Sequence, residues 1–246
     1  MSEARIISGW MVLGVGILLT VLALGAAWLV HRSAVVTGIS VEGQYITSES
    51  QIVAQTGISE GTPSDSIHYL SVIERLETLP WIEKAHIAVS PGGRIRVRVD
   101  EQQPMARIPS GRRSVFLTAG GLVLPSEPGK PIDVPVVRGI AIQERSGEHV
   151  LPDTLSGPEF EMLRDFLTQA RYFPALHALI SEVWVSRQDG IRVVTGSPSL
   201  HLRIGHDEFD DALQRWQTFH GRVLATQIET DIQTLDLRFR GQVVAR

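Results

Sequence analysis

The residues best suited to chemistry in this 246-residue chain gather near its C-terminal end. Two histidines, His201 and His206, lie close in sequence to the carboxylates Asp207, Glu208, Asp210 and Asp211. Carboxylate oxygens suit a hard cation such as calcium. The same carboxylates are also favourable at the start of a helix, where they complement its dipole, and Asp207 is a natural N-cap residue. We therefore expect a helix start here and no metal site.

The motifs of the common catalytic sites are absent from the sequence. The chain contains no cysteine, no HExxH, no GxSxG and no phosphate-binding glycine loop. A lack of cysteine also fits an oxidising compartment. The net charge of −4 gives no electrostatic footprint for DNA or RNA. We expect a protein that is not an enzyme, with no cofactor, no nucleic-acid partner and no small-molecule substrate.

A second charged pattern lies in the middle of the chain, at Arg94, Arg96 and Arg98. Residues two apart on a strand share one face, so these three cations form a stripe. The stripe is either a docking surface for a partner or a solvated sheet face. The carboxylates of Glu83, Asp100 and Glu101 lie near strand ends, and nothing in the sequence supplies them with an acid–base partner.

The N-terminal segment predicts a membrane anchor. Residues 6–30 carry no charge and are flanked by Arg5 on one side and His31 and Arg32 on the other. About 20 apolar residues are enough for a helix to cross a bilayer. We expect a single transmembrane helix over 6–30, with residues 1–5 in the cytoplasm and the rest outside it. A cleaved signal peptide is the alternative, but its apolar region is about half as long.

Residues 36–104 show the order β-α-α-β-β. A short strand is expected at 36–41, and a helix follows Ser48, whose spacing to Gln51 is that of a capping box, and ends at Gly57. A second helix is expected from about Ser64–Ser66 to Pro80, with an apolar stripe of Ile67, Leu70, Ile73 (or Glu74) and Leu76 (or Glu77). Two alternating strands then flank a turn at 91–93.

Residues 105–246 predict a mixed β-sheet domain with flanking helices, which makes the whole chain α+β in class. Hairpins are expected around 119–121 and at Asp189-Gly190, with a short strand near 134–137 and another at 200–204. Helices are expected from Pro158 and over 207–224. A closing strand is expected over 235–244, where apolar and polar residues alternate.

Four segments, taken together and in order, resemble the FtsQ/DivIB family of bacterial cell-division proteins. They are Leu79–Ala85, Asp100–Ala106, Val115–Leu124 and Leu235–Val244. The first two match the strand start and strand exit around the last hairpin of the family's POTRA domain. The third matches the hairpin that opens its β domain, and the fourth its closing strand, with Phe239 where tyrosine is usual.

The resemblance implies a POTRA domain over 36–104 and an FtsQ-type β domain over 105–246. It also implies a non-catalytic divisome scaffold, single-pass in the bacterial inner membrane at the division septum, which links early and late division proteins. Family members bind the single-pass coiled-coil proteins FtsL and FtsB through the end of the β domain. A last strand at a sheet edge can be extended by a partner strand. The expected partner-binding residues are therefore Leu235, Leu237, Arg238, Phe239, Val243 and Val244; alternatively, this strand is internal.

Two other functions stay open on the sequence. The first is a POTRA module of an outer-membrane assembly or secretion factor, which needs a C-terminal barrel with alternating lipid-facing residues. The expected helices after residue 104 argue against it. The second is a periplasmic enzyme with an unrecognised site, which needs an acid and a base converging in one pocket.

Overall fold

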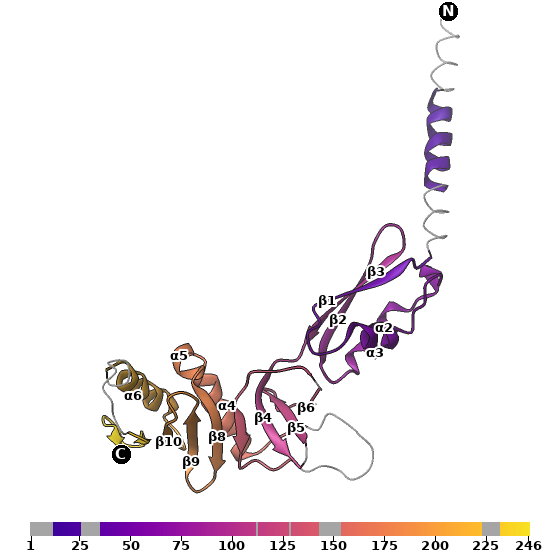
Figure 1. The fold of residues 1–246 in the computed structure, drawn as a ribbon. Coiled ribbons are helices and arrows are strands. Elements are labelled where there is room, and N and C mark those ends of the chain that lie inside the picture. Colours follow the sequence, from indigo (N-terminus) through magenta and orange to yellow (C-terminus); the bar gives the residue numbers. More distant parts are fainter. Residues whose placement is uncertain (1–11, 26–34, 112, 128, 143–153, 223–231) are drawn as a thin grey trace, which may run out of the picture. The chain divides into compact units, whose positions relative to one another are not determined.

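The structure is a computed structural model that describes residues 12–25, 35–111, 113–127, 129–142, 154–222 and 232–246. Figure 1 shows the fold. The chain divides into two compact units, Met1–Glu101 and Gln102–Arg246. The sequence predicts the boundary after residue 104. Residue 104 is the first residue of a strand that belongs to the second unit's sheet, so the predicted boundary lies slightly too late in the chain.

An apolar helix covers residues 12–25, drawn in indigo in Figure 1. Its large apolar side chains are exposed, from Val12 at 72% to Leu24 at 66%. Within the part of the chain that the structure describes, no helix has both the length and the apolar character needed to span a membrane. The predicted span 6–30 extends on both sides of this helix into residues that lie outside the described part. The expected cytoplasmic head at 1–5 also lies outside the described residues.

The first unit has the predicted β-α-α-β-β order. Its elements are β1 (Gly38–Glu42), α2 (Glu49–Thr56), a 3-10 turn η1 (Ser64–Ser66), α3 (Tyr69–Glu77), β2 (Ile82–Val89) and β3 (Arg94–Glu101). The sheet order is β1-β3-β2, with β1 parallel and β2 antiparallel to β3. Buried apolar residues of α2 and α3, such as Ile52 and Leu76, pack against Ile95, Val97 and Val99 of β3.

The capping signals of α2 are confirmed. The Ser48 hydroxyl accepts the backbone N–H of Gln51 at 3.2 Å, while the Gln51 side chain accepts the backbone N–H of Ser48 at 3.1 Å. At the other end Gly57 adopts a left-handed conformation with φ 63°. Both ends of the helix are therefore satisfied by residues within the segment itself.

The second helix differs from its prediction. The residues 64–66 form only the turn η1, Ile67 is extended, and α3 begins at Tyr69. This break changes the phase of the helix, so that Val72 and Leu76 are buried while Leu70 is 77% exposed. Leu76 of the expected stripe is confirmed, and Leu70 was wrongly placed in it.

The second unit is a nine-stranded mixed sheet with the order β12-β11-β10-β9-β8-β7-β4-β5-β6. Its strands are β4 (Pro104–Ser110), β5 (Arg113–Thr118), β6 (Val123–Pro125), β7 (Val136–Arg138), β8 (Ile180–Ser186), β9 (Gly190–Thr195), β10 (His201–Gly205), β11 (Thr234–Asp236) and β12 (Val244–Ala245). Both predicted hairpins form, as β5–β6 and β8–β9. Most neighbouring strands are antiparallel, but the β4–β7, β7–β8 and β10–β11 pairs are parallel.

Helices cover the inner face of this sheet. They are α4 (Pro158–Ala170), the short α5 (Pro174–His177) and α6 (Phe209–Arg222), and Figure 1 shows α4 and α6 beside β8 and β10. The predicted start of α4 at Pro158 is confirmed, and Phe160, Leu163 and Phe166 are buried as expected. Helix α6 begins at Phe209, two residues beyond Asp207. Its predicted last residues, Val223 and Leu224, lie outside the described residues.

Candidate partner-binding site

The C-terminal segment folds as a hairpin rather than as the single closing strand expected over 235–244. Strand β11 ends at Asp236, and the chain then turns, with Gly241 at φ 73°, before β12 pairs back on β11. The Leu237 N–H donates to the Arg203 carbonyl of β10 at 2.9 Å, which ties the start of the turn to the sheet. The prediction of one continuous strand was wrong because this turn interrupts it.

Among the strands that the structure describes, β12 forms one edge of the sheet and β6 the other. Thr234 and Arg246 exchange two backbone hydrogen bonds of 2.9 Å each. Hydrogen-bonded residue pairs alternate along an antiparallel ladder. The backbone groups of Val243 and Ala245 are therefore expected to face away from β11, where a further strand would bind them.

The predicted site residues fall into two groups. Leu235 and Leu237 are fully buried in the core, at 0% exposure, and their side chains have no surface to offer a partner. Phe239 is 46% exposed, Arg238 is exposed, and Val243 and Val244 are half-buried. Arg238, Phe239, Val243 and Val244 thus lie together around the turn and the edge strand. The two leucines belong to the core on which this segment packs.

A groove of about 500 Å³ lies between α6 and the hairpin. Its lining combines the apolar Phe219 and Val243 with charged and polar side chains: Asp211, Gln214, Arg215, Thr218, Arg222, Gly241 and Gln242. Sequence reasoning found only the hairpin side of this groove. The helical side had a signal, because Asp211, Arg215, Thr218 and Arg222 recur at intervals of four, three and four and so share one face of α6.

Ion pairs and hydrogen bonds hold the hairpin turn in place. Arg238 donates to both carboxylate oxygens of Asp236, at 2.9 and 2.6 Å, and the Arg240 guanidinium pairs with Glu208. Arg215 Nη2 donates to the Leu237 carbonyl at 2.7 Å. The turn is thus fixed from β11, from α6 and from the residue before α6, so its exposed side chains are presented in one arrangement.

The Asp236–Arg238 pair makes the hairpin sensitive to acid. The hydrogen bond from Arg238 lowers the pKa of the Asp236 carboxyl below its ordinary value of 3.8. A lowered pKa means that the stabilisation is complete above the unfolded-state pKa and is lost as the pH falls through the folded-state pKa. We expect Arg238→Gln to raise the Asp236 pKa toward its ordinary value in a carboxyl carbon NMR titration. Arg240→Gln is the matched control, and an unchanged Asp236 pKa in Arg238→Gln would contradict the assignment.

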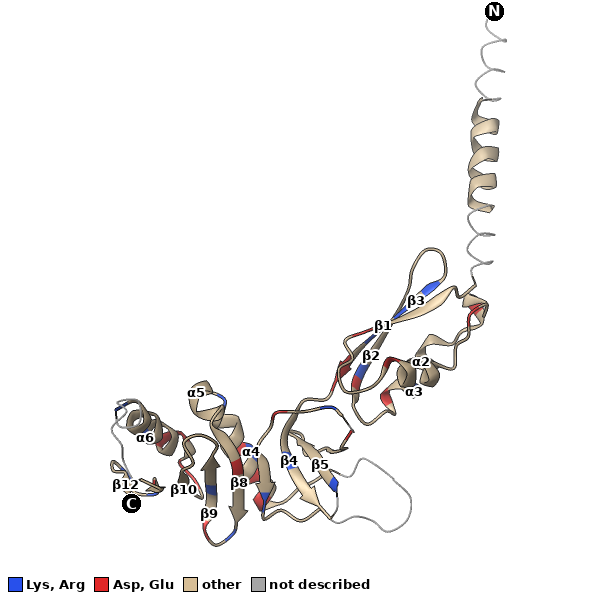
Figure 2. Ribbon diagram, viewed as in Figure 1, with Lys and Arg blue, Asp and Glu red and all other residues tan. Residues whose placement is uncertain are grey.

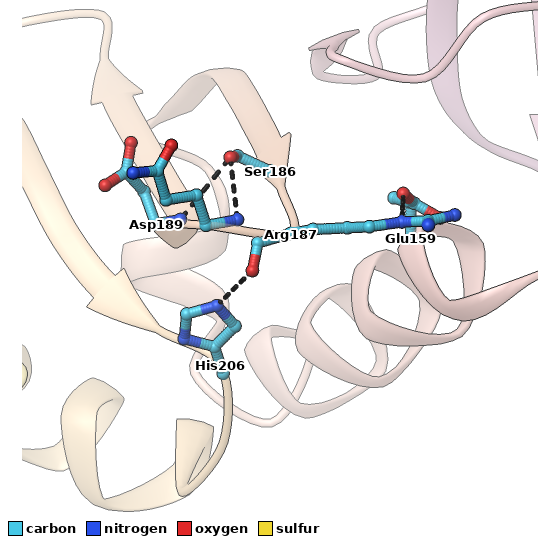
Figure 3. A network of polar contacts seen from close by, with 6 residues as sticks. Glu159, Ser186, Arg187, Asp189 and His206 are labelled. Atoms are coloured by element: carbon cyan, nitrogen blue, oxygen red, sulfur yellow. Dashed lines mark hydrogen bonds and ion pairs between the residues drawn. The ribbon is translucent and has the colours of Figure 1, made fainter.

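The β8–β9 turn is held by a network of polar contacts. Figure 3 shows it at the β8–β9 turn. The Ser186 hydroxyl accepts the backbone N–H groups of Gln188 and Asp189, at 3.1 and 3.4 Å, and Arg187 pairs with Glu159 of α4. The His206 ring contacts the Arg187 backbone carbonyl at 3.0 Å. These contacts fix the turn.

Two other predicted features can be placed. Among the residues that the structure describes, no group of three or more His, Asp or Glu is arranged to hold a metal ion. Arg94, Arg96 and Arg98 lie exposed on the outward face of the first unit's sheet, as Figure 2 indicates along β3. Arg96 is 3.3 Å from Glu42, and His86 is 3.6 Å from Asp100 on the same face.

Comparison with known proteins defines the class of the first unit. A family model described as "POTRA domain, FtsQ-type" matches residues 36–102. The chain is 28% identical to the cell division protein FtsQ of Rhodothermus marinus, over 92% of this chain and 83% of that one. It is 27% identical to the cell division protein FtsQ of Salinibacter ruber, over 96% of this chain and 92% of that one.

A solved structure of the major extracytoplasmic domain of the cell-division protein DivIB from Geobacillus stearothermophilus also matches, with a TM-score of 0.32 and 16% identity. That match covers 53% of this chain and 99% of the other. Residues 36–102 thus form an FtsQ-type POTRA domain. The similarity of the chain to cell division proteins FtsQ over most of its length supports a role in bacterial cell division.

Proposed function

We propose that this chain is a non-catalytic, membrane-anchored scaffold of the divisome, and that the β12 edge binds a single-pass partner of the FtsB or FtsL type. The observation that carries the proposal is the position of β12 as the outermost strand, beside the groove of α6. An edge strand offers main-chain groups for a partner strand, and a neighbouring groove offers specificity for its side chains.

The proposed anchor is a helix over 6–30, of which 12–25 is described. The described part is apolar on all sides and exposed, as the large side chains from Val12 to Leu24 indicate. A helix that is apolar all round is buried in a large core or in a membrane. We place residues 1–5 in the cytoplasm and residues 36–246 outside it.

Anchoring in one membrane makes a modest contact sufficient. Two proteins tethered to the same bilayer meet at a raised effective concentration, so the second contact becomes nearly intramolecular. A partner strand along β12 would gain main-chain hydrogen bonds with Val243 and Ala245. Its apolar side chains would meet Phe239, Val243 and Phe219, and its acidic ones Arg215 or Arg222.

The test is the affinity of the full chain, in detergent, for peptides from FtsB-type and FtsL-type partners. We expect Phe239→Glu to weaken binding at least about tenfold, because a buried aromatic contact would become a desolvated charge. Tyr172→Glu is the matched control, because Tyr172 is 80% exposed on the same unit at the end of α4. Equal binding by the two variants would overturn the site, and no binding by the wild type would overturn the partner assignment.

A proline variant separates strand addition from side-chain docking. Ala245→Pro removes an N–H that is expected to face outward, and edge strands tolerate proline at such a position. We expect Ala245→Pro to keep the fold, by circular dichroism, and to lose partner binding. If Ala245→Pro binds as the wild type does, the partner does not extend β12.

A further inference from the structure

The outward face of the second unit's sheet carries a row of aligned charged and aromatic residues. On neighbouring strands Arg138 lies opposite Trp184, and Trp184 lies opposite Arg192. Arg192 in turn lies opposite Arg203, and Arg203 lies opposite Asp236. The row therefore crosses β7, β8, β9, β10 and β11 in register. We call Arg138, Trp184, Arg192 and Arg203 the arginine–tryptophan row.

Trp184 stands at the centre of this row between two cations. The guanidinium carbon of Arg138 lies 5.5 Å from the centre of the indole ring, and that of Arg192 lies 5.9 Å from it. The indole Nε1 donates to Glu182 at 3.2 Å, and Arg138 donates to the same carboxylate at 3.3 Å. Trp184 is thus held in one orientation, yet 39% of it is exposed.

The arrangement is unfavourable for the sheet alone. Arg192 and Arg203 lie directly opposite each other on β9 and β10, and like charges at such positions destabilise a sheet. All three arginines of the row are exposed, and so is Arg107 on the same face. Like charges placed opposite each other, on an exposed surface and beside a tryptophan held in one orientation, are typical of a functional surface.

The charges select the chemistry of the partner. This face carries four arginines, Arg107, Arg138, Arg192 and Arg203, against three carboxylates, Glu182, Asp236 and Asp189, the last lying 3.9 Å from Arg192, although the whole chain has a net charge of −4. Figure 2 shows the basic band on β9 beside the acidic one on β8. A uniform polyanion such as a nucleic acid would place phosphates against Glu182 and Asp236. A peptide can set separate carboxylates against the arginines and neutral residues against those two positions.

We propose that the arginine–tryptophan row is a second docking surface, and that it binds an acidic segment of a protein partner. Neighbouring strands lie about 4.8 Å apart, so Arg138 and Arg192, two strands apart, are separated by about 10 Å. Three residues of a peptide in the polyproline II conformation span about 9 Å and complete one turn, so side chains three residues apart share one face. A segment lying across the strands with an acidic side chain at every third position would meet both arginines and cover the indole.

The test measures fluorescence polarisation of a labelled peptide of four Glu-Gly-Ala repeats, titrated with the full chain in detergent. We expect Trp184→Ala to weaken binding at least about tenfold and Arg192→Gln to weaken it several-fold, with affinity falling as salt is added. Tyr172→Ala and Arg171→Gln are the matched controls, both exposed and outside the row. Phe239→Glu is expected to leave binding unchanged, which separates this surface from the β12 edge.

Three outcomes would overturn the proposal. They are equal binding by Trp184→Ala and Tyr172→Ala, equal binding of the Gln-Gly-Ala peptide, and tighter binding of a twelve-residue single-stranded oligothymidine. The last result would assign the row to nucleic acid instead. Because both Trp184 and Arg192 are exposed, their variants are expected to keep the circular dichroism spectrum of the wild type.

Discussion

Replacing Trp216 with alanine is expected to lower the free energy of unfolding of the second unit by about 3–5 kcal/mol. Trp216 is fully buried at 0% exposure and is the largest such side chain in the described chain. It lies on the inner face of α6, in the core shared with Phe166, Phe209 and Leu213. The loss combines the transfer of a large ring with a cavity that a sheet and two helices cannot close.

Two further variants sharpen this prediction. The indole Nε1 of Trp216 has no hydrogen-bond partner among the described residues, so phenylalanine removes an unsatisfied donor along with part of the ring. Trp216→Phe is therefore expected to lose clearly less stability than Trp216→Ala in urea unfolding followed by circular dichroism. Trp184→Ala is the control, because Trp184 is outside the core. Equal losses at positions 184 and 216 would contradict the packing argument.

The Trp216 variant also bears on partner binding. Helix α6 supplies one wall of the groove, and Arg215 on the same helix bonds the carbonyl of Leu237 in the hairpin turn. Loosening the inner face of α6 thus disturbs the groove without changing any residue that lines it. We expect Trp216→Ala to weaken binding of FtsB-type peptides while Trp216→Phe largely preserves it.

Glu101→Ala is expected to destabilise the first unit by about 1.5–3 kcal/mol, which is the range for hydrogen bonds to a charged group. The Glu101 carboxylate accepts three successive backbone N–H groups, from Tyr45 at 2.9 Å, Ile46 at 2.8 Å and Thr47 at 2.7 Å. Ile46 and Thr47 are buried, so water cannot readily replace the carboxylate as hydrogen-bond acceptor for their backbone N–H groups.

Asp100→Ala is the matched control for this prediction. Asp100 is the neighbouring carboxylate on β3, its side chain is 51% exposed, and its contact with His86 is 3.6 Å long. We expect a change within about 0.5 kcal/mol there, as for most surface substitutions. Urea unfolding of the two variants gives the comparison, and hydrogen exchange at Ile46 and Thr47 should rise in Glu101→Ala alone. Comparable losses in both variants would refute the role of Glu101.

Features encoded within a few residues could be predicted from the sequence. The start of α2 rests on Ser48 and Gln51, its end on Gly57, and the start of α4 on Pro158. The β8–β9 hairpin rests on its glycine at position 190, whose φ is 73°. In each case the residues that decide the conformation lie within the element or beside it, so no knowledge of the rest of the fold is needed.

Features that depend on distant partners could not be predicted. Glu101 lies more than fifty residues from the backbone groups it binds, and sequence alone left it as a strand-end charge. The arginine–tryptophan row joins residues from several strands and is visible only once the register is known. The C-terminal hairpin was mistaken for one strand because alternation continues through the turn. The hydrogen bond from Leu237 to Arg203, which marks the start of the turn, depends on the distant strand β10.

The candidate site also contains some residues that are recognisable within one segment and others that depend on how distant elements pack. Arg238, Phe239, Val243 and Val244 could be proposed from the sequence because they lie together in one segment. The wall formed by α6 was missed because its contribution depends on where that helix packs. Leu235 and Leu237 were included because alternation alone does not say which face of an edge strand is buried.

The parallel pairing of β1 with β3 gives the first unit a particular response to pulling. The two strands run side by side from Gly38 opposite Arg94 to Glu42 opposite Arg98, and they are the first and last strands of the unit's sheet along the chain. A force that draws residue 35 away from residue 101 therefore slides one strand along the other and loads all their hydrogen bonds together. Such a shear resists more tension than peeling the bonds one at a time, so we expect the β1–β3 pair to be the mechanically strongest part of the first unit.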